Sequence, residues 1–150
     1  MDNSSWVAVA AGATHTLAIR SDGALYSWGD NTHGQLGTPG TSRSSLAQVG
    51  TSTAWAKIAA GDGHSVGIQA NGTLWCWGAN ADGQLGNGST LDRDGPVQVG
   101  EARDWVLPGA GAQHSLAIRT DGSLWAWGRN AAGQLGLGDL VSRTTPTALP

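Results

Sequence analysis

The sequence LWAWGRNAAGQLG, residues 124–136, is the third copy of one pattern in this chain. Earlier copies read LYSWGDNTHGQLG at residues 25–37 and LWCWGANADGQLG at residues 74–86. A pattern that recurs every 20 to 50 residues or so is typical of propellers, solenoids and other repeat architectures. The spacing is 49 and then 50 residues, measured between the equivalent tryptophans Trp28, Trp77 and Trp127.

The composition favours an all-β fold without nucleic-acid binding. The 150 residues include 24 glycines and contain no long helical pattern, which favours many short strands joined by tight turns. Charged residues make up 13% of the chain, the net charge is −3, and Lys and Arg do not cluster. We therefore expect no nucleic-acid partner, because binding phosphate groups needs a basic surface.

Targeting signals are absent from the sequence. Its first residues have neither the basic nor the apolar region of a signal peptide. No run of about 18 apolar residues occurs, so we expect no membrane partner and, by default, a cytoplasmic location. The single cysteine, Cys76, excludes an internal disulfide but does not identify the compartment.

Each repeat begins with a short apolar run that predicts a strand. We divide the chain, taken as one domain, into repeats at residues 6–54, 55–104 and 105–150, and each repeat opens on a tryptophan. In the third repeat, Pro108 removes a hydrogen-bond donor from this strand. We therefore expect that strand to be bulged or shortened.

A hairpin follows in every repeat. The second strand starts at a histidine and ends at an Asp-Gly or Asn-Gly pair, which precedes the third strand. Such a pair between two apolar runs predicts a tight hairpin in which both central turn residues have positive φ. The pairs are Asp22-Gly23, Asn71-Gly72 and Asp121-Gly122.

A fourth strand is predicted in the variable, polar part of each repeat, around residues 45–49, 96–99 and 146–149. Four antiparallel strands per repeat predict three blades of a β-propeller. Strand alternation puts Leu25 and Ser27 on one face of the first blade, and Tyr26 and Trp28 on the other. One face is therefore small and aliphatic and the other bulky, as expected if the blades stack face against face.

The complete pattern resembles the RCC1 (regulator of chromosome condensation) repeat. It reads Gly-x-x-His-[Ser/Thr]-x-[Ala/Gly]-Ile and then [Asp/Asn]-Gly-x-Leu-aromatic-x-Trp-Gly-x-Asn-x-x-Gly-Gln-Leu-Gly, and the similarity covers residues 6–150. The resemblance implies a β-propeller, usually closed by seven repeats in one chain, whereas this chain carries three. It also implies one of several activities: guanine-nucleotide exchange, chromatin binding, β-lactamase inhibition, ultraviolet sensing or scaffolding.

For several of these activities, the residues that the family uses are missing from this sequence. The ultraviolet receptor of the family carries a Trp and an Arg before the His of certain repeats, where this chain has Ala13-Thr14, Asp62-Gly63 and Ala112-Gln113. Chromatin-binding members use basic tails, and none is present in these residues. No exchange-factor residue can be carried over, because the loops that hold them are not matched.

Three blades would form an open arc. If each end face exposed on the order of 300 Å² of apolar surface, the lost burial would be roughly 15 kcal/mol, which rivals the whole stability of a domain, about 5–15 kcal/mol. The end of the third repeat is in phase with the start of the first, since Pro150 aligns with Gly100. We therefore expect a head-to-tail homodimer that closes a six-bladed ring, or completion by further propeller repeats.

Recurring polar residues are expected to be structural. A catalytic group is rarely needed in triplicate, whereas a hydrogen bond to a neighbouring loop is needed in every blade. A metal site on the histidines is the alternative, but they lack carboxylate or cysteine partners in the sequence. We expect no catalytic residue, cofactor or metal. The structural positions are His15, His64, His114, Trp28, Trp77, Trp127, Asn31, Asn80, Asn130, Gln35, Gln84 and Gln134.

Two further features are expected to be structural as well. Cys76 replaces Ser27 and Ala126 on the small blade face, which favours a buried filler over a reactive thiol. Residues 80–83 and 92–95 resemble calcium loops superficially, but neither continues to the Glu that an EF-hand requires. We expect ordinary turns there.

Positions that differ between matched repeats are the candidates for partner binding, because loops tolerate variation. Drift without function is the alternative. We expect a non-enzymatic interaction module or scaffold that presents these loops to a protein; the alternative is a regulator of another protein, such as a nucleotide-exchange factor or an enzyme inhibitor. The candidate loop residues are Asp30, Thr32, His33, Asp82 and Arg129, with the longer segments 38–44, 87–94 and 137–143.

Overall fold

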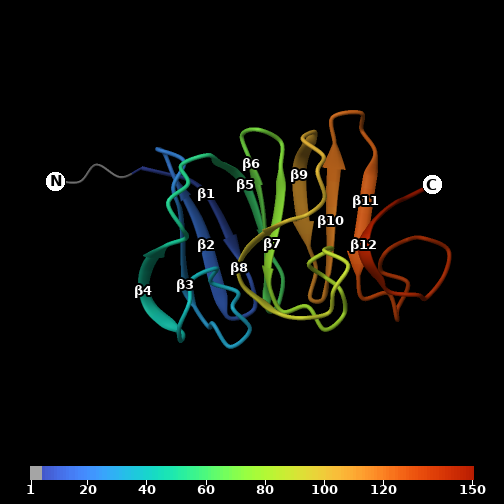
Figure 1. Cartoon of the computed structure of the whole chain (residues 1–150), viewed down its shortest axis with the longest axis horizontal. Coiled ribbons are helices and arrows are strands. Elements are labelled where there is room, and N and C mark those ends of the chain that lie inside the picture. Colours follow the sequence, from blue (N-terminus) through green and yellow to red (C-terminus); the bar gives the residue numbers. More distant parts are fainter. Residues whose placement is uncertain (1–4) are drawn as a thin grey trace.

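The computed structural model describes residues 5–150 as three blades that stand side by side. Within that range it contains twelve strands, arranged in three four-stranded antiparallel sheets, and no helix. The first blade (blue) and the third (orange) lie at opposite ends of the molecule, so the ring is open (Figure 1). The predicted all-β part-propeller of three four-stranded blades is confirmed.

Each blade uses its strands in sequence order, with the first and the fourth strand at the two edges of the sheet. The first strands of the three blades contact one another along the inside of the arc. No helix in the described residues is long and apolar enough to cross a membrane. The strands are β1 (Trp6–Ala11), β2 (His15–Arg20), β3 (Leu25–Gly29), β4 (Arg43–Gln48), β5 (Trp55–Ala60), β6 (His64–Gln69), β7 (Leu74–Gly78), β8 (Arg93–Gln98), β9 (Trp105–Ala110), β10 (His114–Arg119), β11 (Leu124–Gly128) and β12 (Arg143–Ala148).

The predicted hairpins are confirmed, but their turn type differs from the prediction. Gly23 has φ +83°, whereas no residue other than glycine has positive φ within residues 5–150. The Gly23 N–H donates to the Arg20 carbonyl at 2.8 Å, and the Arg20 N–H donates to the Ala24 carbonyl at 2.9 Å. This is a turn with a single left-handed glycine and a bulge. Asp22 has negative φ, and its carboxylate accepts the Ala24 N–H at 3.0 Å, which stabilises the turn.

The Pro108 strand is full length, and its bulge is shared by all three blades. β9 spans six residues, as do β1 and β5, so of the two predicted alternatives the strand is bulged and not shortened. In every blade the register shifts just after the opening tryptophan, so the bulge does not depend on Pro108. Pro108 pairs with Ala117 in an edge strand, where a missing N–H costs no ladder bond on the open side.

The fourth strands begin earlier than predicted and end one residue sooner. Each starts at an arginine that pairs with the last glycine of the third strand, as Arg43 does with Gly29. A register shift separates that pair from the next one along the ladder. The hydrophobic pattern therefore marked only the second half of each strand, because the first half is polar and exposed.

The predicted stacking of unlike faces is confirmed. The aliphatic face of the first blade, with Leu17 and Leu25, packs against Trp55 and Trp77 of the second blade. The second boundary repeats this arrangement, with Leu74 of the second blade and Trp127 of the third in one cluster. Trp77 and Trp127 are both fully buried, which shows that the tryptophans serve the contact between blades.

Close approach of neighbouring blades should make Gly72 much more sensitive to substitution than Gly100. Both have positive φ, +79° and +65°, but a Cβ at Gly72 would lie 2.0 Å from the carbonyl oxygen of Arg103, in the segment that leads into the third blade, while one at Gly100 would meet nothing within 4 Å. We expect Gly72→Ala to lower the free energy of unfolding by about 1–3 kcal/mol more than Gly100→Ala, measured by urea denaturation. Equal losses would mean that the third blade moves aside at no cost.

Candidate functional site

A histidine from each of the first two blades reaches across the boundary to the next blade, and we call each such boundary a seam. His15 Nε2 lies 2.9 Å from Ser65 Oγ, and His64 Nε2 lies 2.9 Å from Ser115 Oγ. The Gly-x-x-His motif makes room for the ring, because a Cβ at Gly61 would lie 2.3 Å from Cε1 of His64. The motif thus places one imidazole against the following blade at each seam.

The serine hydroxyl in each seam also donates a hydrogen bond to a backbone carbonyl of the preceding blade. Ser65 Oγ donates to the Gln35 carbonyl at 2.7 Å, and Trp77 Nε1 donates to the same oxygen at 3.0 Å. Since the serine has one proton and gives it to Gln35, the His15 ring must donate through Nε2. Ser115 Oγ donates to the Gln84 carbonyl at 2.7 Å in the second seam. We call this histidine–hydroxyl–carbonyl chain the seam relay.

Burial keeps the relay histidines neutral. Loss of solvent, with smaller contributions from the nearby His15 and His114, lowers the pKa of His64 to about 4. Burial also lowers the pKa of His15, against the opposing effect of Asp30, and lowers that of His114. Within residues 5–150 no group of three or more His, Cys, Asp or Glu side chains is placed to hold a metal ion.

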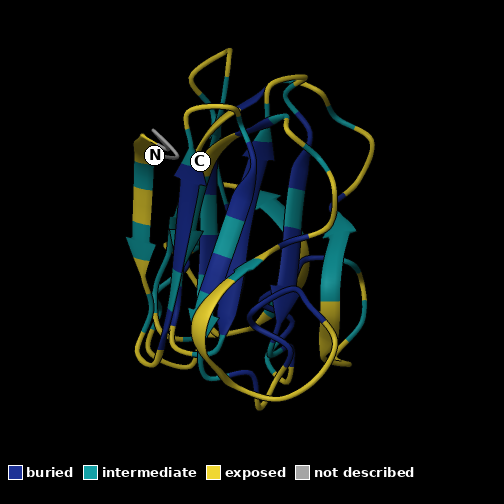
Figure 2. Cartoon of the chain, turned by 90° about the vertical axis from the view of Figure 1, so that its left-hand side faces the viewer, coloured by how far each residue is buried: buried dark blue, intermediate teal, exposed yellow. Residues whose placement is uncertain are grey.

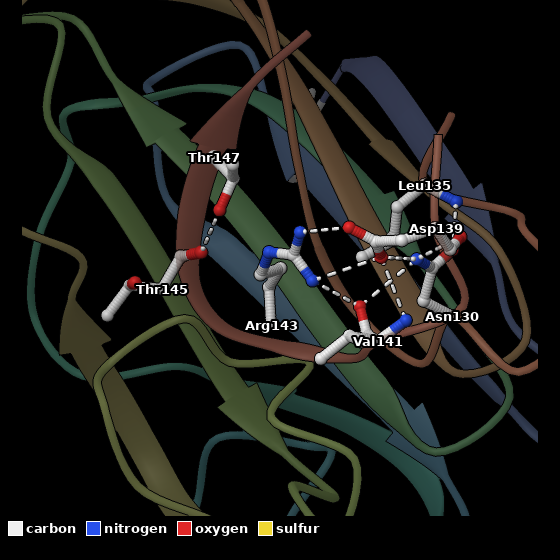
Figure 3. Close-up of polar contacts among 7 residues, drawn as sticks. All are labelled: Asn130, Leu135, Asp139, Val141, Arg143, Thr145 and Thr147. Carbon is white, nitrogen blue, oxygen red and sulfur yellow. Dashed lines mark hydrogen bonds and ion pairs between the residues drawn. The ribbon is translucent and has the colours of Figure 1, made fainter. Parts of the chain in front are cut away.

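The recurring asparagines organise the long loop of each blade (Figure 3). In the third blade, Asn130 Nδ2 donates to the carbonyls of Asp139 and Val141 at 3.0 Å each, while its Oδ1 accepts the Leu135 N–H at 3.0 Å. Arg143 adds an ion pair with Asp139 at 2.8 Å. Asn31 and Asn80 make the corresponding contacts in the first and second blades, including acceptance of the Leu36 and Leu85 N–H groups.

The recurring glutamines hold the turn that precedes them. Gln35 Oε1 accepts the His33 N–H at 2.8 Å, and Gln84 and Gln134 accept the equivalent N–H groups at 2.9 Å each. The side chains of Gln35 and Gln84 are buried, whereas that of Gln134 is only partly buried.

Asp30, one of the candidate partner-binding residues, has a role inside its own loop. Its carboxylate accepts hydrogen bonds from Thr32 at 2.6 Å, Ser42 at 3.0 Å and Gln35 at 3.0 Å. These bonds, with the Thr32 side chain the largest cause, lower the pKa of Asp30 to about 2. Asp30 and Thr32 therefore stabilise the first loop whether or not they also contact a partner.

The other candidates lie along the same loop surface. His33 Nδ1 lies 2.8 Å from Asp92 of the second blade, across the seam. Arg129 donates to Gln113 Oε1 at 2.9 Å, and the Asp82 carboxylate has no bond of its own recorded among the described residues. Three of the five candidate residues, Asp30, His33 and Asp82, line a cavity of about 290 Å³. We call the surface around this cavity the loop rim; its lining includes Asp30, His33, Asp62, Asp82, Gln84 and Gln113.

The two end blades each leave one face uncovered. Trp6 is 45% exposed, whereas the equivalent Trp55 and Trp105 are 5% exposed inside the seams. The open face of the first blade forms a groove of about 470 Å³ lined by Trp6, Val9, Trp28 and Leu46, among others. Figure 2 views this side and shows exposed segments on β1 beside buried central strands. We call this surface the tryptophan face.

The third blade exposes the complementary aliphatic surface, which we call the leucine face. Leu116, Ile118 and Leu124 are partly buried, while their counterparts in the first blade, Leu17, Ile19 and Leu25, are at most 1% exposed. Leu107 is 51% exposed on the same side. The tryptophan and leucine faces are therefore the two halves of a contact that occurs twice within the chain.

Cys76 and the two calcium-like segments have structural surroundings. Cys76 is fully buried, and burial raises the pKa of its thiol well above the ordinary value. In the second blade, Asp92 Oδ1 accepts the Asn80 N–H at 2.9 Å, so both segments join in one loop contact. These contacts fit the expected filler and turns.

Sequence reasoning missed the residues that receive the cross-blade contacts. It did not single out Ser65, Ser115 or Asp92, although the [Ser/Thr] after each histidine was part of the pattern. It also missed Arg119, whose guanidinium lies 5.2 Å from the ring centroids of both Trp105 and Trp125 and pairs with Asp104 at 2.8 Å. A hydroxyl recurring beside each histidine was the available signal.

Buried His64 should make the fold weaker in mild acid. Its pKa is about 4 in the folded chain and about 6.5 in the unfolded chain, so the unfolded state binds more protons between these values. We expect the free energy of unfolding to fall as pH drops from about 6.5 to 4, by up to about 1.4 kcal/mol per pH unit from this group. Urea titrations across this range check it; a His64→Gln variant with the same pH slope as the wild type would contradict it.

Comparison with known proteins agrees with the repeat pattern and the blades. Two models of the regulator of chromosome condensation (RCC1) repeat match, one at residues 6–35, 55–84 and 109–134, the other at residues 22–68 and 71–118. The chain is similar in fold to human WBSCR16, with a TM-score of 0.89 at 24% identity over 100% of this chain and 41% of that one.

Similar values hold for a second propeller, Prp20p from Saccharomyces cerevisiae. The TM-score is 0.85 at 22% identity, and the match covers 99% of this chain and 40% of Prp20p. A structure of yeast RCC1 (Prp20) bound by Kap60 matches with a TM-score of 0.80 over 95% of this chain and 37% of that one. This chain thus spans about two fifths of the length of these structures. Its three repeats and their blades place it in the RCC1 repeat family.

Proposed function

We propose that this chain is a non-enzymatic interaction module that associates head to tail with a second copy of itself, closes a six-bladed ring and presents the loop rim to a protein partner. The observation that carries the proposal is that its two open faces are the two halves of its own internal seam. The tryptophan face of one copy fits the leucine face of the other, just as successive blades fit within the chain.

The open faces lack the polar cover that ends an array of repeats. Terminal repeats of solenoid proteins are usually capped by polar outer surfaces. Here Leu46, 53% exposed, stands where the other blades have Pro96 and Pro146, and exposed Leu107 stands where the second blade has Lys57. Apolar side chains at both ends favour coverage by another blade over contact with water.

Further propeller repeats are the other occupant that fits these faces. The chain spans about two fifths of the propellers that it resembles, so a longer chain would supply blades of the same kind. For Prp20p, binding to Gsp1p and histones is described, and yeast RCC1 is bound by Kap60. These relatives support protein binding as the role of the loop rim, including regulation of another protein as the second candidate.

The side chains that would be reactive in other settings support a role without catalysis. His15 and His64 are buried and engaged in the seam relay, so neither is free to exchange protons with a substrate. Cys76 is fully buried, and its raised pKa disfavours the thiolate. The variable loops, rather than the repeated residues, are therefore proposed to contact the partner.

The mass in solution tests the proposed assembly. Sedimentation equilibrium of the 150-residue chain at micromolar concentration should give a discrete particle of twice the 15.2 kDa chain mass. A head-to-tail contact that did not close would give larger open polymers instead. A monomer at this concentration would overturn the proposed self-association and leave further repeats as the occupant of the open faces.

A charge on the tryptophan face should prevent the association. Val9 is 72% exposed on that face in the single chain, so Val9→Glu should leave the blade folded but bury a carboxylate in the dimer. We expect Val9→Glu to sediment as a monomer. Leu91→Glu is the matched control, because Leu91 is 69% exposed on the long loop of the middle blade, and this variant should remain dimeric. Loss of the dimer in both variants would point to a general effect of charge.

A further inference from the structure

The seam relay follows one chemical rule at both internal seams. The preceding blade supplies a histidine N–H and a glutamine carbonyl, and the following blade supplies a hydroxyl between them. In the first seam these are His15, Gln35 and Ser65, joined at 2.9 and 2.7 Å. The hydroxyl accepts from the ring and donates to the carbonyl, so this buried hydroxyl is paired both as a donor and as an acceptor.

The third blade carries the first half of this relay without a blade beyond it. His114 and Gln134 occupy the positions of His64 and Gln84, but both are partly exposed where their counterparts are buried. Among the described residues, no hydrogen bond is recorded for the His114 ring or for the Gln134 carbonyl. One donor and one acceptor therefore point away from the chain at the leucine face.

The first blade carries the other half. Thr16 occupies the position of Ser65 and Ser115, and it pairs in the sheet with Trp28, as Ser65 does with Trp77. Both Thr16 and Trp28 are partly exposed on the tryptophan face, and no hydrogen bond is recorded for either side chain in the described part of the chain. Thr16 keeps the hydroxyl that the relay needs, one donor and one acceptor, and Trp28 supplies a second donor.

The backbone offers a further matching pair. The Trp55 and Trp105 N–H groups donate to the Gly23 and Gly72 carbonyls of the preceding blades, each at 3.1 Å. Trp6 and Gly122 stand in these positions at the two open faces. Two tryptophan faces brought together would oppose donors to donors, whereas a tryptophan face on a leucine face gives each donor an acceptor. The placement of N–H donors on one face and carbonyl acceptors on the other therefore favours head-to-tail contact.

No charge opposes this contact at the loop edge of the seam. The contact between His33 Nδ1 and Asp92 Oδ2 bridges the first seam, and the equivalent positions at the open faces are Ala132 and Ser42. Both are neutral and exposed. The occupant that fits must therefore provide a hydroxyl and an indole N–H to the leucine face and an imidazole and a carbonyl to the tryptophan face. This chain provides both sets.

We propose that a second copy of this chain completes the seam relay, with His114 donating to the Thr16 hydroxyl of the second copy, and with that hydroxyl and the Trp28 indole donating to the Gln134 carbonyl. This proposal rests on the proposed self-association and specifies its register. Thr16 and His114 are then determinants of the association rather than of the fold of one chain.

Two substitutions of Thr16 distinguish association that needs the Thr16 hydroxyl from association by apolar packing alone. Thr16→Val keeps the shape but removes the hydroxyl, so it would leave the His114 N–H and the Gln134 carbonyl poorly paired in a buried seam. We expect it to raise the dimer dissociation constant by about 10-fold or more, whereas Thr16→Ser should stay within about 3-fold of the wild type. Sedimentation velocity across a dilution series measures both, and urea unfolding of the diluted monomers checks that both remain folded.

Equal dissociation constants for Thr16→Val and Thr16→Ser would overturn the relay while leaving the proposed dimer intact. A wild-type chain that stays monomeric would instead overturn the proposed function on which the relay rests. The two failures are therefore distinguishable in one set of measurements.

Thiol cross-linking tests the register directly. Ser42→Cys and Ala132→Cys place reactive thiols at the positions that correspond to Asp92 and His33, while native Cys76 is fully buried. In a head-to-tail dimer, a short bis-maleimide should link the two variants when they are mixed and neither variant alone. A cross-linked dimer within Ser42→Cys alone would show that two tryptophan faces meet, and it would overturn the proposal.

Discussion

The packing of a tryptophan onto the aliphatic face of the preceding blade is the contact on which the structure depends. A four-stranded sheet has two faces, and neither can be buried by the blade itself. Trp77 is fully buried because Leu17, Leu25 and Val49 of the first blade cover it. Trp55 adds an edge-on contact with Trp77, with the ring centroids 5.6 Å apart. Each blade therefore buries one of its faces only where another blade lies beside it.

The polar contacts of the seam follow from this packing. At the first seam the buried Trp77 indole N–H donates to the Gln35 carbonyl, whereas the Trp127 indole N–H at the second seam has no partner among the described residues. The histidine and the serine then occupy the remaining buried space as a neutral hydrogen-bonded pair. Recurrence of the histidine in each repeat is explained by this shared need, so three identical histidines do not indicate three reactive sites.

The long loops contain two kinds of residue: recurring asparagines that fix the loop, and residues that vary from blade to blade. Asn31, Asn80 and Asn130 each hold a long loop through both ends of one amide, which leaves the rest of the loop free to vary. The variable residues then take different roles: Asp30 stabilises its own loop, and His33 bridges a seam to Asp92. Asp82, facing the rim cavity beside Asp62, is the candidate with the fewest internal contacts. A repeated frame thus carries a surface that differs from blade to blade.

The sequence by itself determined the features that arise within one repeat. Strand alternation identified the unlike faces, and glycine after Asp or Asn identified the hairpins, because both depend on neighbouring residues. It misjudged the turn type and the start of the fourth strands, where pairing with Gly29 and its equivalents overrides the apolar pattern.

Only the tertiary structure decided which residues meet across a seam. His15 and Ser65 are 50 residues apart, and Gln35 lies between them in sequence. Their contact depends on how two whole sheets are rotated and offset against each other, and no local pattern encodes that placement. The unequal burial of Trp6 and Trp55, residues that match in sequence, has the same origin: one has a neighbouring blade within the chain and the other does not.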